Sequence, residues 1–125
     1  MRLTIHRLTH LPEQHHQHAG LILQQHTLPE KQPFLLATFN DKAVAMAWHR
    51  QEQIVFFAVR DITRRRGVGS ELLRRLKEQA KAEGLTRLEL NLNNAPEQQT
   101  EALAAFFEQA GFHRQQGVLS CSLYS

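Results

Sequence analysis

The sequence predicts a single α/β (α+β) domain that spans residues 1–125. Three observations support this prediction. The 125 residues are enough for one hydrophobic core and too few for two typical ones. Apolar residues alternate with polar residues in several short segments, which is the pattern of half-buried strands. In two other segments the apolar residues recur every three or four positions, which is the pattern of amphipathic helices. The expected order is strand, helix, three strands, helix, strand, helix, strand.

The first half of the chain reads as a strand, a helix and an antiparallel meander. Leu3 and Ile5 alternate with polar residues, and the His- and Gln-rich stretch that follows contains one apolar run between Pro12 and Pro29. Asn40-Asp41-Lys42 has the composition of a hairpin turn. The expected elements after the first strand are a helix at roughly 13–25 and strands at 34–39, 43–49 and 54–59.

The second half alternates helices with strands. Val68, Leu72, Leu76 and Ala80 define an amphipathic helix, and Gly84 is placed to end it. Residues 87–92 alternate as a strand, and 119–123 alternate as the last one. Between these strands, a second helix is marked by four apolar positions and a terminal glycine: Leu103, Phe106, Phe107, Ala110 and Gly111.

Composition favours a cytoplasmic protein. No apolar stretch exceeds about six residues, against roughly 20 for a membrane span, and the N-terminus lacks an export signal. Cys121 is the single cysteine, which fits a reducing compartment. The net charge is +3, and basic residues cluster at 64–66 and 74–77. A compact basic patch of this kind suits a phosphate-bearing small molecule or nucleic acid, and composition does not separate the two.

The segment from Ile54 to Ser70 combines a strand, a basic loop and the start of a helix beside two glycines. The first N–H groups of a helix lack intrahelical partners and carry partial positive charge, so they attract anions. Gly67 and Gly69 present no Cβ to an approaching phosphate, and Thr63 offers a hydroxyl. A P-loop is a poor fit because no lysine precedes Ser70, and a dinucleotide fingerprint lacks its third glycine.

Two motifs resemble those of the GNAT superfamily. Arg64-x-x-Gly67-x-Gly69 is similar to its acyl-CoA motif, and residues 105–112, which end in Gly-Phe, resemble its second motif. The resemblance implies a GNAT fold, with a mixed central sheet of about six to seven strands and helices on both faces. It also implies acetyl-CoA or CoA as ligand, with the pyrophosphate on the 64–70 loop and the pantetheine arm along 57–59. The residues implied to bind the cofactor are Phe57, Ala58, Val59, Thr63, Arg64, Arg65, Arg66, Gly67, Val68, Gly69 and Ser70.

The catalytic acid of most GNAT enzymes has no counterpart in the motif. That acid is a tyrosine, and the alignment on Gly111-Phe112 puts Phe107 in its place, while Tyr124 is the only tyrosine. No catalytic residue is therefore predicted. His49, Glu52 and Glu89 are conceivable bases, but the interpretation as ordinary surface or strand residues is favoured, and Cys121 is interpreted as a small core residue and not a nucleophile. The six histidines of the first 26 residues show no metal-ligand spacing, so we expect an exposed His/Gln-rich helix and no metal.

Over its whole length the chain resembles the small CoA-binding GNAT proteins that promote maturation of aspartate 1-decarboxylase. The resemblance is carried by residues 3–8, 37–42, 59–69, 105–112 and 115–117. It implies a regulator that binds the decarboxylase proenzyme when loaded with acetyl-CoA or CoA. Self-cleavage of the proenzyme then forms the pyruvoyl group for pantothenate and CoA biosynthesis. Asn40 corresponds to a partner-facing position, although the 43–59 hairpin is shorter here than is usual in the type.

Two other functions are alternatives to this regulator. A small N-acetyltransferase that works without the tyrosine, on an unknown amine, is the alternative. Nucleic-acid binding through the arginine clusters is disfavoured, because the charge is modest and no aromatic residues interleave with the arginines.

Overall fold

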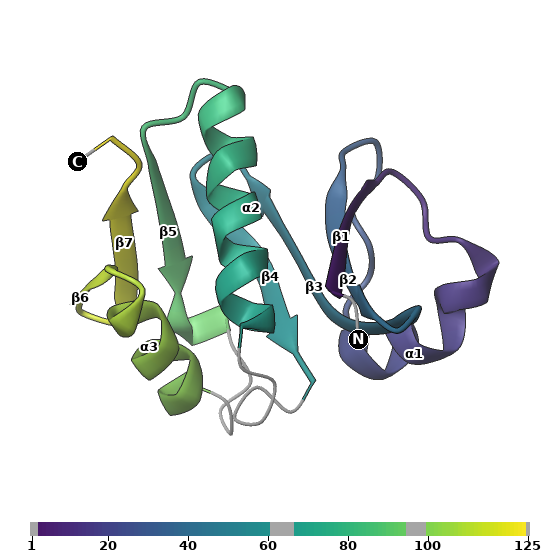
Figure 1. Cartoon of the computed structure of the whole chain (residues 1–125). Helices are drawn as coiled ribbons and strands as arrows, with labels where there is room; N and C mark the ends of the chain where they lie inside the picture. Colours follow the sequence, from purple (N-terminus) through teal and green to yellow (C-terminus); the bar gives the residue numbers. More distant parts are fainter. Residues whose placement is uncertain (1–2, 61–66, 95–99, 125) are drawn as a thin grey trace. The chain divides into compact units, whose positions relative to one another are not determined.

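The computed structural model describes residues 3–60, 67–94 and 100–124 (Figure 1). In that part of the chain seven strands follow the order β1-β2-β3-β4-β5-β7-β6. The sheet is mixed, because β4 and β5 are parallel while β1–β2, β2–β3, β5–β7 and β6–β7 are antiparallel. The strands are β1 (Leu3–Leu8), β2 (Phe34–Phe39), β3 (Lys42–Arg50), β4 (Gln53–Val59), β5 (Arg87–Asn91), β6 (His113–Gln115) and β7 (Val118–Ser122). The helices are α1 (His16–Leu23), α2 (Val68–Ala82) and α3 (Thr100–Gln109), with short 3-10 segments η1 (Glu13–His15) and η2 (Leu92–Asn94).

The chain forms two compact units. The first contains residues 1–49 and 56–76, and the second contains residues 50–55 and 77–125. Strand β4 and helix α2 each contribute residues to both. The prediction of one domain over residues 1–125 stays a prediction.

In the first unit, β1, β2 and β3 form an antiparallel meander. β1 pairs with β2 from Leu3 opposite Phe39 to Leu8 opposite Phe34. Asn40 and Asp41 connect β2 to β3 with φ of 53° and 67°, the left-handed pair that a tight two-residue hairpin requires. The register of β2 on β3 shifts between Ala37 and Thr38. The predicted turn is therefore confirmed, and a bulge accompanies it.

Helix α1 buries its apolar stripe on one face of this meander. Ala19, Ile22 and Leu23 pack into a core with side chains from three strands. Trp48 stacks on Phe56 with ring centroids 4.6 Å apart and meets the edge of Phe34 at 6.5 Å. The remaining members of this core are Leu36, Ala43 and Met46, with Leu8, Leu11, Leu28 and Ala58 partly buried around it.

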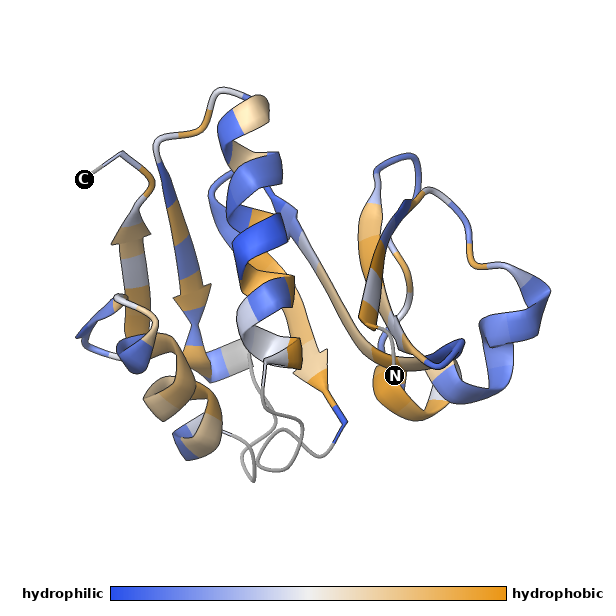
Figure 2. Ribbon diagram, in the orientation of Figure 1, coloured by the Kyte–Doolittle hydropathy of each residue, from blue (hydrophilic) through white to orange (hydrophobic). Residues whose placement is uncertain are grey.

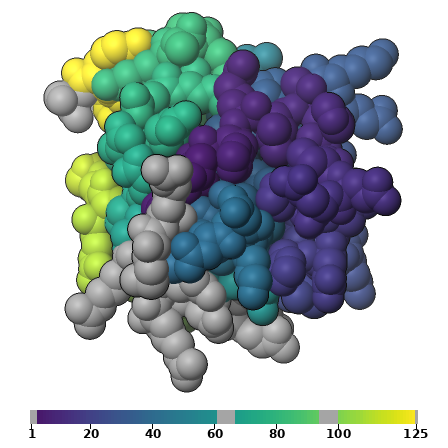
Figure 3. All heavy atoms as spheres, turned by 45° about the vertical axis from the view of Figure 1, so that its right-hand side comes forward, coloured from purple at the N-terminus to yellow at the C-terminus, as the bar shows by residue number. Residues whose placement is uncertain are grey.

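The His/Gln-rich stretch surrounds this helix. The segment between β1 and α1 lies at the surface (Figure 3), and His10, His16 and Gln17 are exposed. His15 is buried, and its ring lies 6.4 Å from that of His6. The predicted helix at 13–25 is thus a 3-10 turn followed by α1. The expected exposure holds for His16, whereas His18 is half-buried, and for the buried His15 the prediction is wrong.

In the second unit, β5, β7 and β6 form an antiparallel sheet. Leu88 and Leu90 are buried, whereas the alternate residues Arg87 and Glu89 face outward, as the sequence pattern predicts. The banding of β5 in Figure 2 reflects this alternation. Cys121, which pairs with Leu88, is only half-buried, so the prediction of a core cysteine is wrong.

Strand β6 is absent from the sequence-based prediction. His113, Arg114 and Gln115 are all exposed, so no apolar alternation marks them. Their pairing with β7 follows from the turn at Gln116 and Gly117, whose φ values are 52° and 83°. The turn at Gln116 and Gly117 could have indicated this strand from the sequence, whereas the hydrophobic pattern could not.

Glycines end α2 and α3 as predicted. Gly84 and Gly111 have φ of 86° and 101°, the left-handed conformation that closes a helix. After each glycine, the next N–H donates to a carbonyl five residues back: Leu85 to Ala80 and Phe112 to Phe107, each at 3.0 Å.

We predict that the core beneath α1 is a main source of stability in the first unit. Leu36 is fully buried there, so Leu36→Ala should lower the free energy of unfolding by about 2–5 kcal/mol. The matched control is Leu21→Ala, because Leu21 is 56% exposed on α1 and should change stability by about 0.5 kcal/mol or less. Chemical denaturation measures both. Equal effects would contradict the assignment of this core.

Candidate functional site

The end of β4 is positioned by a bulge in the β3–β4 hairpin. Gln51 and Glu52 form the turn that joins Arg50 to Gln53. A regular two-residue hairpin would place Val59 opposite Val44. Instead, the Arg60 N–H donates to the Val44 carbonyl at 2.8 Å, so β4 carries one extra residue. Phe56 and Phe57 are both buried, and Phe56 packs with Ala58 in the core beneath α1.

The Arg60 N–H, directly after β4, is directed to β3. Successive residues of a regular strand direct their N–H and C=O groups to opposite sides. An extended chain of amides pairs with backbone donors and acceptors that a strand directs away from its neighbour.

Helix α2 begins eight residues further along, in the same unit. Gly67 has φ of 88°, and its carbonyl accepts the Glu71 N–H at 2.9 Å, which closes the first turn. The N–H groups of Val68, Gly69 and Ser70 precede that bond, so they have no acceptor within the helix. Among the described residues, an ideal Cβ on Gly67 would meet no atom within 4 Å. N–H groups at the start of a helix can bind an anion.

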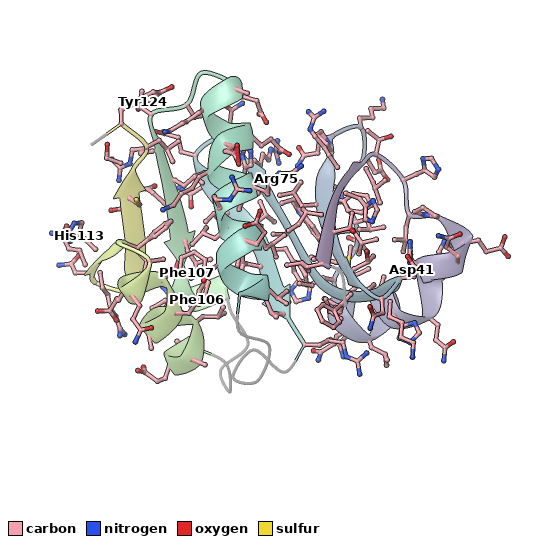
Figure 4. All side chains as sticks on the ribbon, in the orientation of Figure 1. Asp41, Arg75, Phe106, Phe107, His113 and Tyr124 are labelled. Atoms are coloured by element: carbon pink, nitrogen blue, oxygen red, sulfur yellow. The ribbon has the colours of Figure 1, made fainter. Side chains whose placement is uncertain are left out.

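Charged side chains surround this helix start. Arg74 donates through Nε to Glu71 Oε2 at 3.1 Å and through Nη2 to Glu71 Oε1. The hydrogen bond from Arg74 lowers the pKa of Glu71, and the charges of Arg74 and Arg75 lower it further. Glu71 is therefore ionised at neutral pH. Arg75 is half-buried on the same helix (Figure 4).

The residues predicted to bind the cofactor fall into three groups. Phe57, Ala58 and Val59 form the end of β4, and residues 67–70 form the start of α2, so these two groups belong to the same unit. Thr63, Arg64, Arg65 and Arg66 lie outside the described residues. Asn40, predicted to face a partner, is exposed in the β2–β3 turn. Glu71 was not among the residues predicted from the sequence. It precedes Arg74 by three residues and Arg75 by four, a spacing at which helical side chains interact and which could have indicated it.

Phe107, in the position of the usual catalytic tyrosine, lies in the core of the second unit. Its side chain is fully buried and meets Phe106 and Phe112 edge-on, with ring centroids 5.5 and 4.9 Å away. Tyr124 does not replace it. That residue is 62% exposed and lies at the opposite end of β7 from α3, under the Lys81 ammonium (Figure 4).

Two of the conceivable bases, His49 and Glu89, lie within strands. His49 is buried on β3. Glu89 accepts hydrogen bonds from Gln53 at 2.6 Å and from Arg87 on its own strand.

In the described ranges no three His, Cys, Asp or Glu side chains are grouped so that they could hold a metal ion. No helix in those ranges has the length and apolar character to cross a membrane.

Comparisons with known proteins give a consistent assignment. The model of the acetyltransferase (GNAT) family matches residues 3–112. The Escherichia coli protein YhhK, a candidate N-acetyl transferase solved with bound coenzyme A, is 25% identical with a TM-score of 0.77, over 98% of this chain and 99% of that one. No curated protein matches the chain in sequence.

Two further solved structures share the fold. The ribosomal-protein-S18-alanine N-acetyltransferase of Escherichia coli has a TM-score of 0.66 at 21% identity, over 99% of this chain and 96% of that one. A GNAT family acetyltransferase of Elizabethkingia anophelis, solved with acetyl-CoA, has a TM-score of 0.63 at 17% identity, over 96% and 97%.

We predict that the backbone at Gly67 requires glycine for conformational reasons, independent of any ligand. Gly67→Ala places a side chain at φ of 88° and should cost about 1 kcal/mol of stability, although the added Cβ has room. Gly20→Ala is the control, because Gly20 lies within α1, also has room, and should gain about 0.5–1 kcal/mol. Thermal and chemical unfolding measure both. A stabilising Gly67→Ala would contradict the left-handed geometry.

Proposed function

The chain belongs to the acetyltransferase (GNAT) family, and we propose that it is a regulator that binds acetyl-CoA or CoA. In this proposal, the loaded protein promotes self-cleavage of the aspartate 1-decarboxylase proenzyme, which forms the pyruvoyl group. One observation supports this over catalysis: the position of the usual catalytic acid holds Phe107, a side chain without an ionisable group, fully buried among other aromatic rings.

The described residues fit a CoA ligand. Its pantetheine arm contains amides, which match backbone donors and acceptors at the end of β4. Its phosphates match the N–H groups at the start of α2, where among the described residues a Cβ on Gly67 would meet no atom within 4 Å. When bound, acetyl-CoA also supplies an activated thioester. Binding of CoA by YhhK, which is 25% identical over nearly the whole chain, supports this ligand.

The partner assignment depends on the sequence resemblance to decarboxylase activators in residues 59–69 and 105–117. The exposed turn at Asn40 offers a contact for the proenzyme, and it belongs to the same unit as the ligand site. A ligand that binds one conformation of this unit more tightly shifts the population toward it. If that conformation also binds the proenzyme, CoA and proenzyme increase each other's affinity.

We predict that proenzyme cleavage requires the α2 phosphate site. The protein is mixed with the decarboxylase proenzyme of the same organism, with and without acetyl-CoA, and cleavage is followed by gel. Gly67→Asp should abolish acetyl-CoA-dependent cleavage and weaken CoA binding at least about 10-fold, because a carboxylate then faces the phosphates.

The control for that experiment is Gly84→Asp at the other end of α2. Gly84 has nearly the same φ, 86°, and the same open surroundings, so it controls for backbone strain. Wild-type protein that binds acetyl-CoA tightly without promoting cleavage would reject the regulator and leave the ligand in place.

An N-acetyltransferase acting on an unknown amine is the second candidate, supported by fold neighbours that include the S18-alanine N-acetyltransferase. Phe107→Tyr separates the two functions. Because Phe107 is fully buried, the new hydroxyl should cost about 1–3 kcal/mol of stability and bring no acetyl transfer to amines. Phe106→Tyr, at a half-buried neighbouring position, is the control. A rate gain of about 100-fold or more with Phe107→Tyr alone would favour a degenerate enzyme.

A further inference from the structure

Glu71 places a negative charge beside the N–H groups proposed to bind phosphate. It is the first residue of α2 whose N–H is used within the helix, so the preceding N–H groups belong to the turn directly before it. Glu71 lies in the first turn of α2, and its carboxylate contacts Arg74. A carboxylate there stabilises the helix through the dipole. It also repels a phosphate.

Arg74 offsets that repulsion. It holds both carboxylate oxygens of Glu71, through Nε and Nη2. In this paired geometry the two opposite charges nearly cancel at a distance. Arg75, one residue further, adds a second cation near Glu71. The net charge of these three side chains is one positive unit, where two would result without Glu71.

We propose that Glu71 is an internal competitor for the anion site at the start of α2 that limits the affinity of the protein for CoA, and that Arg74 offsets part of this competition. This inference rests on the proposed ligand. A carboxylate that shares the helix dipole with the ligand reduces the gain from phosphate binding. For a sensor this is useful, because a protein reports ligand concentration only where its dissociation constant is comparable to that concentration.

The test measures CoA binding by calorimetry for four proteins: wild type, Glu71→Gln, Arg74→Gln and the double variant. At low salt, Glu71→Gln should tighten binding about two- to five-fold, because one negative charge is removed about 10 Å or less from the phosphates. Arg74→Gln should weaken binding by a similar factor. The double variant, in which both charges are lost, should return to within about two-fold of wild type.

Glu78→Gln is the matched control. It makes the same change in net charge on the same helix, two turns or about 10 Å further from the N-terminus. Its effect should be less than about half that of Glu71→Gln in free energy. Raising the ionic strength to about 0.5 M should remove most of the difference between Glu71→Gln and wild type, since screening then acts over a few ångströms.

The outcomes separate the two proposals. If wild type binds CoA but Glu71→Gln has no more effect than Glu78→Gln, only net charge matters and the role of Glu71 is rejected while the ligand stands. If wild type binds no CoA, the proposed function and this inference fail together. Circular dichroism confirms that each variant keeps its helical content.

Discussion

The hydrogen bond from the Arg60 N–H to the Val44 carbonyl is the constraint on which the site depends. It places one extra residue on β4 relative to a regular two-residue hairpin. On the same strand, Phe56 packs in the core beneath α1, and Phe57 is buried as well. The bond thus fixes the register at the end of a strand that also contributes to the core of the first unit. The pairing proposed for the end of β4 uses backbone groups, and no particular side chain is needed for it.

Phe107 shows how the family fold can be retained when a catalytic position is used for packing. The residue fills the space between Phe106 and Phe112 at the end of α3, where edge-on aromatic contacts add to the burial of apolar surface. A polar side chain there would need a hydrogen-bond partner, and the flanking side chains are aromatic. The proposed ligand-binding residues of β4 and α2 belong to the first unit, whereas Phe107 belongs to the second. Absence of the acid is therefore compatible with the proposed ligand site.

Much of this architecture could be predicted from sequence, because apolar periodicity and glycine placement are local signals. Leu72 and Leu76 on α2, Leu88 and Leu90 on β5, and the terminal glycines Gly84 and Gly111 all lie where the pattern indicates. The bulge in β4 could not, since register depends on pairing with β3. Strand β6 has no apolar side chain to reveal it. Cys121 was predicted to lie in the core because it belongs to an alternating strand, but it is half-buried. The prediction that residues 63–66 bind the cofactor stays a prediction.

The packing of Trp48 also makes this residue an intrinsic fluorescent probe. Trp48 is the single tryptophan of the chain, it is buried, and it lies flat on Phe56, which immediately precedes the segment proposed to pair with pantetheine. Its ultraviolet emission therefore originates from an apolar setting on β3, in contact with β4, the strand proposed to pair with the ligand. Shifts in wavelength or intensity would report changes at β4 from within the native polypeptide. No dye needs to be attached, so the half-buried cysteine can be left unmodified.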